Sequence, residues 1–375
     1  MALSKIKANS ITDDSITVDQ IADTAVHGRR NLIINGDMRV AQRGTSFTSN
    51  GYNVDRWRND VVNAGAFTVT QSTTVPSASG FANSVKWDCT TADSSLSASD
   101  YLIHSQRIEA QNLQHLLYGT SSAKKVTLSF WVRSNKTGTY WAEIQHSDAG
   151  VHSGIRYTIN SADTWEFKTL TFDGYQTTAI NNDTGIGFFV NWWLAAGTTF
   201  TSGTLTENSF HNANANRLIG QVNLADSTSN EWYITGCQLE VGDKATPFEH
   251  RSYGEEYLHC LRYTYVWVSG SQYTNITMGL GAANFDTACT ATKGPVHLPV
   301  PMRGSPSFSK TGDFRVYSNR AQSQLAPTAI SINRASAHTP YLQFSHNSMS
   351  QSGGHMIEMG ANNDTDASIT FDAEL

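Results

Sequence analysis

The chain has 375 residues, enough for two or three domains with sizeable hydrophobic cores. Only 15% of the residues are charged and the formal net charge is −6, without a block of basic residues. Nucleic acid is therefore excluded as the main ligand, because phosphate binding needs clustered Lys and Arg. A membrane span is also excluded, because no apolar run reaches the required length of about 18 residues.

The first predicted element is an extended N-terminal stem, residues 1–28. Its apolar residues recur at a spacing of five, which neither a helix nor a strand produces. They are Ile6, Ile11, Ile16, Ile21 and Val26. Three chains wound around one axis would bury them together, one side chain per chain in each layer, so we predict a homotrimer. The alternative is a disordered polar leader with accidental spacing. The leader also lacks the apolar core of an export signal.

Strand signals then recur every ten to fifteen residues up to residue 250, separated by turns rich in Gly, Asn, Asp, Ser and Thr. The clearest are residues 66–73, 84–89, 125–134, 139–147, 154–160, 166–172, 185–195, 216–224 and 231–240. One helix is predicted over Ser105–Gly119, with Gly119 as its C-cap. Many short strands with one helix predict an all-β jelly-roll sandwich over residues 29–250.

The alternation of three strands identifies which side chains face the core. The predicted inward residues are Val126, Leu128, Phe130 and Val132; Tyr140, Ala142 and Ile144; and Ile186, Phe188, Val190, Trp192 and Leu194. The loop at residues 134–139 predicts a hairpin that pairs Trp131 with Trp141. If the third strand joins the same sheet, one outer face carries Trp131, Arg133, Trp141, Glu143, Gln145, Asn191 and Trp193.

Such a face suits a sugar, because indole rings stack on the apolar side of a pyranose while amides and charges bind its hydroxyls. The alternatives are that loops cover this face or that it is an interface between subunits, where Trp is also enriched.

Residues 231–263 predict a boundary between two domains. A strand ends at a turn with Pro247, and residues 251–263 then form a short helical connector. In a trimer, three copies of this helix would lie near the axis, with Tyr257, Leu258 and Leu261 as contacts. Residues 264–375 again read as strands and predict a second β-sandwich, in which Pro299, Pro301 and Pro306 restrict their segment to an edge strand or extended chain. The polar loop at residues 345–356 is a candidate for host contact, or simply a connection.

Two parts of the sequence carry a resemblance to tail-fibre and other appendage proteins of tailed bacteriophages. One is NLIINGDMRVAQRG at residues 31–44, followed by YNVDRW at residues 52–57. The other resembles a QLE-x-G-x-x-x-T-x-F-E-x-R segment followed by E-x-x-x-C-x-R-Y. Its matching residues are Gln238, Leu239, Glu240, Gly242, Thr246, Phe248, Glu249, Arg251, Glu256, Cys260, Arg262 and Tyr263.

The resemblance implies a homotrimeric virion protein that docks to the particle through its N-terminus. It also implies a jelly roll like that of carbohydrate-binding modules, so the expected partners are other virion proteins and a host surface glycan or envelope receptor. The alternatives are a head fibre, a capsid-decorating fibre or a tail component without a receptor, and thirdly a polysaccharide depolymerase.

A depolymerase requires paired carboxylates, and none of the available acids forms a local catalytic pattern. These acids are Asp55, Asp88, Glu143, Glu166, Glu231 and Glu240. We therefore expect no enzyme activity and no cofactor, although the Asp-containing turn at residues 181–185 is a candidate for a structural Ca²⁺. The widely spaced Cys89, Cys237, Cys260 and Cys289 predict buried, reduced thiols in a protein assembled in the host cytoplasm.

Overall fold

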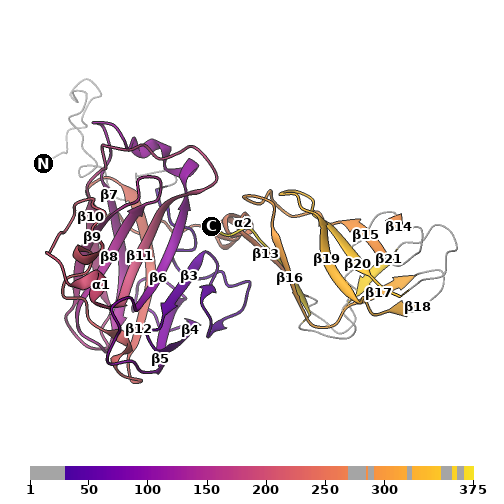
Figure 1. Cartoon of the computed structure of the whole chain (residues 1–375), viewed down its shortest axis with the longest axis horizontal. Coiled ribbons are helices and arrows are strands. Elements are labelled where there is room, and N and C mark those ends of the chain that lie inside the picture. The colour runs from indigo at the N-terminus through magenta and orange to yellow at the C-terminus, as the bar shows by residue number, and fades with distance from the viewer. Residues whose placement is uncertain (1–29, 269–283, 286–290, 319–322, 348–356, 361–366) are drawn as a thin grey trace, which may run out of the picture.

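A computed structural model describes residues 30–268, 284–285, 291–318, 323–347, 357–360 and 367–375. The predicted stem at residues 1–28, Cys289 and most of the loop at residues 345–356 lie outside these residues. Strands make up 41% of the chain and helices 9%, which confirms the predicted all-β fold class. Two bodies of β-structure lie side by side, joined by one helix (Figure 1).

The first body is a sandwich of two six-stranded antiparallel sheets (Figure 1). In spatial order, sheet A contains β1 (Ser46–Phe47), β4 (Ala66–Ser72), β5 (Ser84–Thr91), β12 (Glu231–Val241), β7 (Val126–Ser134) and β10 (Glu166–Phe172). Sheet B contains β2 (Gly51–Tyr52), β3 (Trp57–Val62), β6 (Tyr101–Glu109), β11 (Ile186–Ala196), β8 (Gly138–His146) and β9 (Val151–Ile159).

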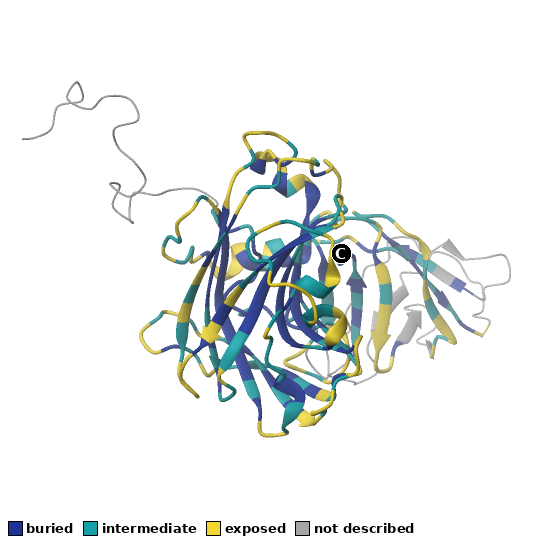
Figure 2. Ribbon diagram, turned by 60° about the vertical axis from the view of Figure 1, so that its left-hand side comes forward, coloured by how far each residue is buried: buried dark blue, intermediate teal, exposed yellow. Residues whose placement is uncertain are grey.

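The core lies between these sheets, where buried residues concentrate (Figure 2). The predicted inward side chains of β7 and β8 are fully buried, as are those of β11 from Phe188 to Leu194, which confirms the alternation. Ile186, at the start of β11, is only partly buried.

An aromatic cage occupies the middle of the core around His104 of β6. The His104 ring stacks on Trp57, with 4.8 Å between ring centroids, and meets Trp87 and Trp232 edge-on. Both ring nitrogens of His104 are buried without a hydrogen-bond partner among the described residues. Burial lowers the pKa of His104 from 6.5 to about 3, so the ring is neutral in the folded protein.

The predicted hairpin between β7 and β8 is wrong. β7 pairs with β10 and β12 in sheet A, whereas β8 pairs with β9 and β11 in sheet B. Residues 134–139 therefore cross from one sheet to the other. The alternation was right while the pairing was wrong, because inward residues of both sheets enter the same core and the period alone does not tell the sheets apart.

Two further elements differ from the sequence prediction. The helix expected over Ser105–Gly119 is in fact the end of strand β6 followed by a 3₁₀ helix, η4 (Ala110–Leu116). It ends at Leu117, which has a φ of 56°, rather than at Gly119. The strand expected over 216–224 is a loop between η5 (Asn214–Asn216) and η6 (Leu224–Asp226). In both places side-chain burial against the sandwich overrides the local pattern, as the buried Leu113, Leu116 and Leu218 indicate.

The described residues of the second body form three small antiparallel sheets. One has β13 (Thr264–Val268), β22 (Ser368–Asp372) and β16 (Ser307–Thr311), and is called sheet C here. The others have β14 (Asn284–Phe285), β15 (Ala291–Pro295), β20 (Tyr341–Ser345) and β19 (Ala329–Arg334), and β18 (Ser323–Leu325), β17 (Arg315–Ser318) and β21 (Ile357–Gly360). Leu342, Phe344, Ile369 and Phe371 belong to a core separate from that of the jelly roll.

The segment with Pro299, Pro301 and Pro306 forms no strand among the described residues, in agreement with the predicted extended chain. Strand β15, just before it, ends at Pro295. Strand β16 was not predicted, since it directly follows this proline-rich segment.

The predicted helical connector is confirmed as α2 (Tyr253–Leu261), which begins where the Ser252 hydroxyl accepts a hydrogen bond from the Glu255 amide. Its predicted trimer contacts divide. Leu258 is 54% exposed and Tyr257 is partly buried, but Leu261 is only 3% exposed. Leu261 as a contact between chains is therefore wrong, because its side chain is already packed within its own chain.

Candidate functional site

The seven residues of the predicted sugar-binding face do not share a face. Trp131 and Arg133 belong to β7 in sheet A, whereas the others belong to β8 and β11 in sheet B. Trp141 pairs with Trp193 in the register of β8 and β11, in place of the predicted partner Trp131. The face divides because the predicted hairpin between β7 and β8 does not form.

The half on sheet B lies beneath residues 197–222, called the covering segment here. Trp141 and Trp193 are buried and cluster with Leu218 of this segment. The Trp141 indole donates to the carbonyl of Ile219 at 3.2 Å, and the Arg217 guanidinium lies 4.8 Å from the Trp193 ring centroid. These indoles are therefore covered by a loop, which was one of the alternatives left open by the sequence.

Glu143 anchors the covering segment. Its side chain is fully buried, accepts a bond from Asn191 at 2.9 Å, and binds the Arg217 guanidinium through both oxygens, with Nε at 2.7 Å. Burial alone would raise the pKa of Glu143, but the charge and hydrogen bonds of Arg217 outweigh it and lower the pKa. Gln145, two residues along β8, is partly buried.

The half on sheet A remains at the surface. Trp131 of β7 lies opposite Phe167 of β10, with 5.4 Å between ring centroids, and Phe167 is 49% exposed. Next to them, the register of β12 shifts between Thr235 and Gln238, around a Gly236 with a φ of +62°. A Cβ at Gly236 would lie 2.5 Å from the Phe81 ring and 3.2 Å from the Trp131 ring, so both rings rest on this glycine.

The row of rings continues beyond Phe81. Its ring centroid lies 5.0 Å from that of Phe248 and 5.4 Å from that of His250. Phe167, Trp131, Phe81, Phe248 and His250 are called the aromatic strip here. Trp131 alone was predicted for a binding face. Phe81, Phe248 and His250 were missed because they lie on loops, where no period marks a shared face.

Charged groups flank the strip on the outer side of sheet A. Arg133 bonds Asp163 at 2.8 Å and lies 4.9 Å from the Tyr233 ring centroid. Lys86 bonds Glu231 at 2.5 Å. The strip is therefore an apolar surface with hydrogen-bonding groups at its side.

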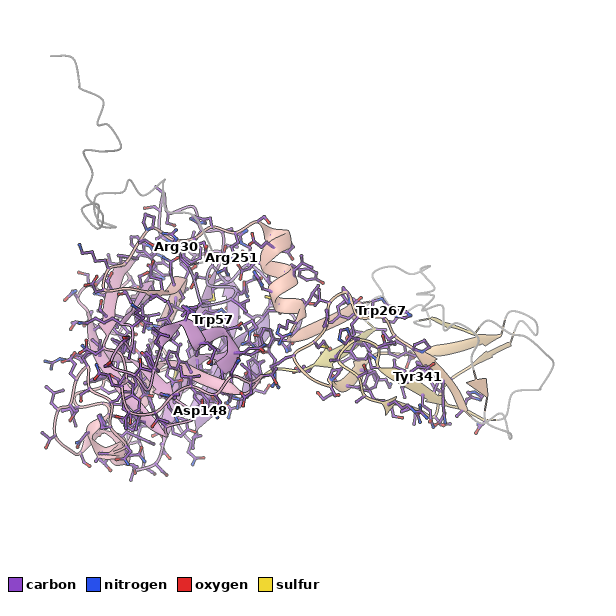
Figure 3. All side chains as sticks on the ribbon, turned by 90° about the horizontal axis from the view of Figure 1, so that it is seen from above. Arg30, Trp57, Asp148, Arg251, Trp267 and Tyr341 are labelled. Atoms are coloured by element: carbon purple, nitrogen blue, oxygen red, sulfur yellow. The ribbon has the colours of Figure 1, made fainter. Side chains whose placement is uncertain are left out.

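The residues of the two sequence motifs meet in space, although they are more than 200 positions apart (Figure 3). The Asn31 side chain bonds the backbone of both Cys237 and Leu239. Glu249 accepts hydrogen bonds from the backbone amides of Arg30 and Asn31. Burial alone would raise the pKa of this carboxylate, but these hydrogen bonds and the charge of Arg251 outweigh it and lower the pKa. Arg251 donates to the carbonyl of Asn31 at 2.5 Å.

The same motifs bind the second body. Arg262, after α2, holds Glu109 of β6 at 2.8 Å, and the Arg56 guanidinium lies 3.5 Å from the Tyr263 ring centroid. Glu374 forms ion pairs with both Arg56 and Arg43. These contacts are called the joint here. The resemblance motifs thus build the connection between the two bodies.

The candidate catalytic acids all have structural partners. Glu166 bonds Lys168, Glu240 bonds Thr246, and Asp55 bonds Gln42. Asp183 and Asp148, at the predicted Ca²⁺ turn, accept bonds from Gly185 and Asn181. Within the described ranges, no group of three or more His, Cys, Asp or Glu side chains could hold a metal ion. In the same part of the chain, no helix is long and apolar enough to cross a membrane, and Cys89, Cys237 and Cys260 are buried and free.

The first body is defined by its sheets as a jelly-roll β-sandwich. No family model and no curated protein matches the chain. Among solved structures, the chain is similar to the enzymatically active domain of tailspike protein 4 of bacteriophage CBA120, with 14% identity and a TM-score of 0.31 over 56% of this chain. The match spans 21% of that chain, about a fifth of its length.

Two sugar-binding proteins are also similar. One is a putative sugar binding protein from Bacteroides thetaiotaomicron, with 13% identity and a TM-score of 0.30 over 57% of this chain and 100% of that one. The other is TmCBM61, described in complex with beta-1,4-galactotriose, with 13% identity and a TM-score of 0.26 over 57% and 100%. At these identities and TM-scores, the similarity identifies neither a ligand nor a partner.

Proposed function

We propose that this protein is a non-enzymatic appendage of a tailed-phage particle and binds a glycan on the host surface through the aromatic strip. The aromatic strip carries this proposal. Phe167 is exposed, Trp131 beside it is partly exposed, and a contiguous apolar row at a protein surface is typical of a ligand or partner site. Pyranose rings have an apolar side that stacks on such rings, while Arg133 and Lys86 lie within the same sheet face to bind hydroxyls.

The assignment to a phage particle rests on the motif residues and on the joint that they build. An appendage has to hold its outer domain in a fixed orientation relative to its attachment point, and the buried ion pairs of the joint would provide this rigidity. The N-terminal stem would dock to the particle and form the axis of a homotrimer. The protein would assemble in the host cytoplasm and reside in the virion.

The test is binding of the purified full-length protein to whole host cells. A variant with Trp131→Ala and Phe167→Ala should bind at least about tenfold more weakly, since stacking contributes roughly 0.5–1.5 kcal/mol per ring beyond area burial. Tyr253→Ala is the matched control, because this aromatic residue is 56% exposed but lies on α2 and is not part of the strip. Equal binding by both variants and the wild type would overturn the assignment to the strip.

A head fibre, capsid-decorating fibre or tail component without a receptor is the second candidate, and the joint favours it because its ion pairs fix the two bodies relative to each other. Labelling and electron microscopy of intact particles would locate the protein. Particles that carry it, combined with no cell binding by the purified trimer, would support this candidate.

Deletion of residues 1–27 should leave a folded protein that fails to join particles. A depolymerase, the third candidate, would release reducing sugar from host polysaccharide, and we expect no release.

A further inference from the structure

A cleft of about 620 Å³ lies between the two bodies, within the range of about 300–1,000 Å³ that ligand sites occupy. One wall comes from the jelly roll and includes Arg43, Tyr52 and Arg58. The other wall is sheet C, which contributes Val268, Ser309 and Thr370. The cleft is separate from the aromatic strip, which lies on the outer side of sheet A.

The alternation of sheet C explains the chemistry of its wall. Ile369 and Phe371 of β22 point into the core of the second body, so Thr370 between them points toward the cleft. Ser309 of β16 pairs with Thr370, which places two hydroxyl side chains next to each other. No described residue forms a hydrogen bond with either side chain. Val268, 51% exposed, adds an apolar surface to this wall.

The joint holds the cleft open in one geometry. Arg43 bonds Asp372 at 2.8 Å, and Gln42 donates to the carbonyl of Thr264 at 3.0 Å, so both walls are tied together at the base. A ligand would therefore not have to order the two bodies when it binds, which lowers the entropic cost of binding.

The charges of the cleft favour a neutral ligand. Arg58 forms a two-point contact with Asp60, and Arg43 faces the carboxylates of Asp372 and Glu374. Each lining arginine is thus already matched by an acid.

We propose that this cleft binds a neutral oligosaccharide, as a glycan site additional to the aromatic strip. Sugar hydroxyls both donate and accept hydrogen bonds, as the Ser309 and Thr370 side chains do. The apolar C–H groups of the sugar lie against Val268. The guanidinium carbons of Arg43 and Arg58 are 5.7 and 5.6 Å from the Tyr52 ring centroid, which holds the aromatic wall in place.

The test uses the full-length protein on an array of immobilised short neutral hexose oligosaccharides and uronic-acid oligosaccharides of the same length. The cleft variant combines Ser309→Ala with Thr370→Val, which removes both hydroxyls at nearly constant volume. Circular dichroism should show an unchanged fold, because neither hydroxyl has a partner within the described chain. Thr90→Val is the matched control, an exposed strand threonine of β5 outside the cleft.

The wild type and Thr90→Val should bind neutral probes, and the cleft variant should lose about tenfold in affinity, since two hydrogen bonds are removed. Equal binding by the cleft variant, binding of acidic probes alone, or no binding to any probe would each overturn the proposal. The aromatic-strip variant separates this outcome from the proposed function. If the aromatic-strip variant loses binding to cells while the cleft variant binds both cells and neutral probes normally, the strip is the receptor site and the cleft is not a glycan site.

Discussion

Replacement of His104 should make the protein less sensitive to acid. In the folded protein its ring is enclosed by Trp57, Trp87 and Trp232, and burial lowers its pKa from 6.5 to about 3. The unfolded chain takes up this proton near its ordinary pKa, whereas the folded protein does not. The neutral ring therefore gives full stability above pH 6.5, and stability falls as the pH decreases toward about 3.

The size of the effect follows from the two pKa values. One pKa unit corresponds to about 1.4 kcal/mol, so His104 should cost about 1.4 kcal/mol of unfolding free energy at about pH 5.5 and about 3 kcal/mol at about pH 4.5. His104→Phe keeps an aromatic ring against Trp57 but removes the titrating group. Asp55, whose pKa burial raises to about 6, titrates in both proteins and cancels in the difference.

Urea unfolding followed by Trp fluorescence, repeated at several pH values, measures this difference. The gap between His104→Phe and the wild type should grow in favour of the variant as the pH falls. His104→Leu is the control for ring packing: it should lower stability at neutral pH but show the same flattened pH dependence. Parallel curves for all three proteins would refute the reasoning, because His104 would then gain its proton equally in the folded and unfolded states.

Three other substitutions test the covering segment, the strip and the joint. Arg217→Met should lower the free energy of unfolding by roughly 3 kcal/mol or more, because the Glu143 carboxylate is left buried without its partner, and proteolysis of residues 197–222 should become faster. Adding Glu143→Gln should recover part of this loss. Strict additivity of the two substitutions in a double-mutant cycle would contradict the pairing. Gly236→Ala should cost roughly 1–3 kcal/mol because of its positive φ and the Phe81 ring. Gly254→Ala, which meets open space within helix α2, should instead leave the stability unchanged or raise it by up to about 1 kcal/mol, as measured by urea unfolding. Glu374→Gln should uncouple the two bodies and split the calorimetric transition in two; a single unchanged transition would argue against the joint.

The sequence by itself determined which side chains of the strands form the core. The inward residues of β7 and β8 could be read because the alternation of a strand is a local property of the backbone. The helix α2 could be read for the same reason, since Ser252 and the acidic first turn define its start within a few positions.

Only the tertiary structure decided which strands are neighbours. Trp131 and Trp141 are ten positions apart and have the same outward parity, yet they lie on opposite sheets, because pairing depends on contacts with β10, β11 and β12 far along the chain. The aromatic strip, the cleft and the joint depend on such contacts too. Phe81 reaches Trp131 only across Gly236 of β12, and Arg43 meets Asp372 only where the second body folds back on the first. Such long-range contacts follow from the packing of the two bodies, and the local alternation of apolar and polar residues in the sequence carries no information about them.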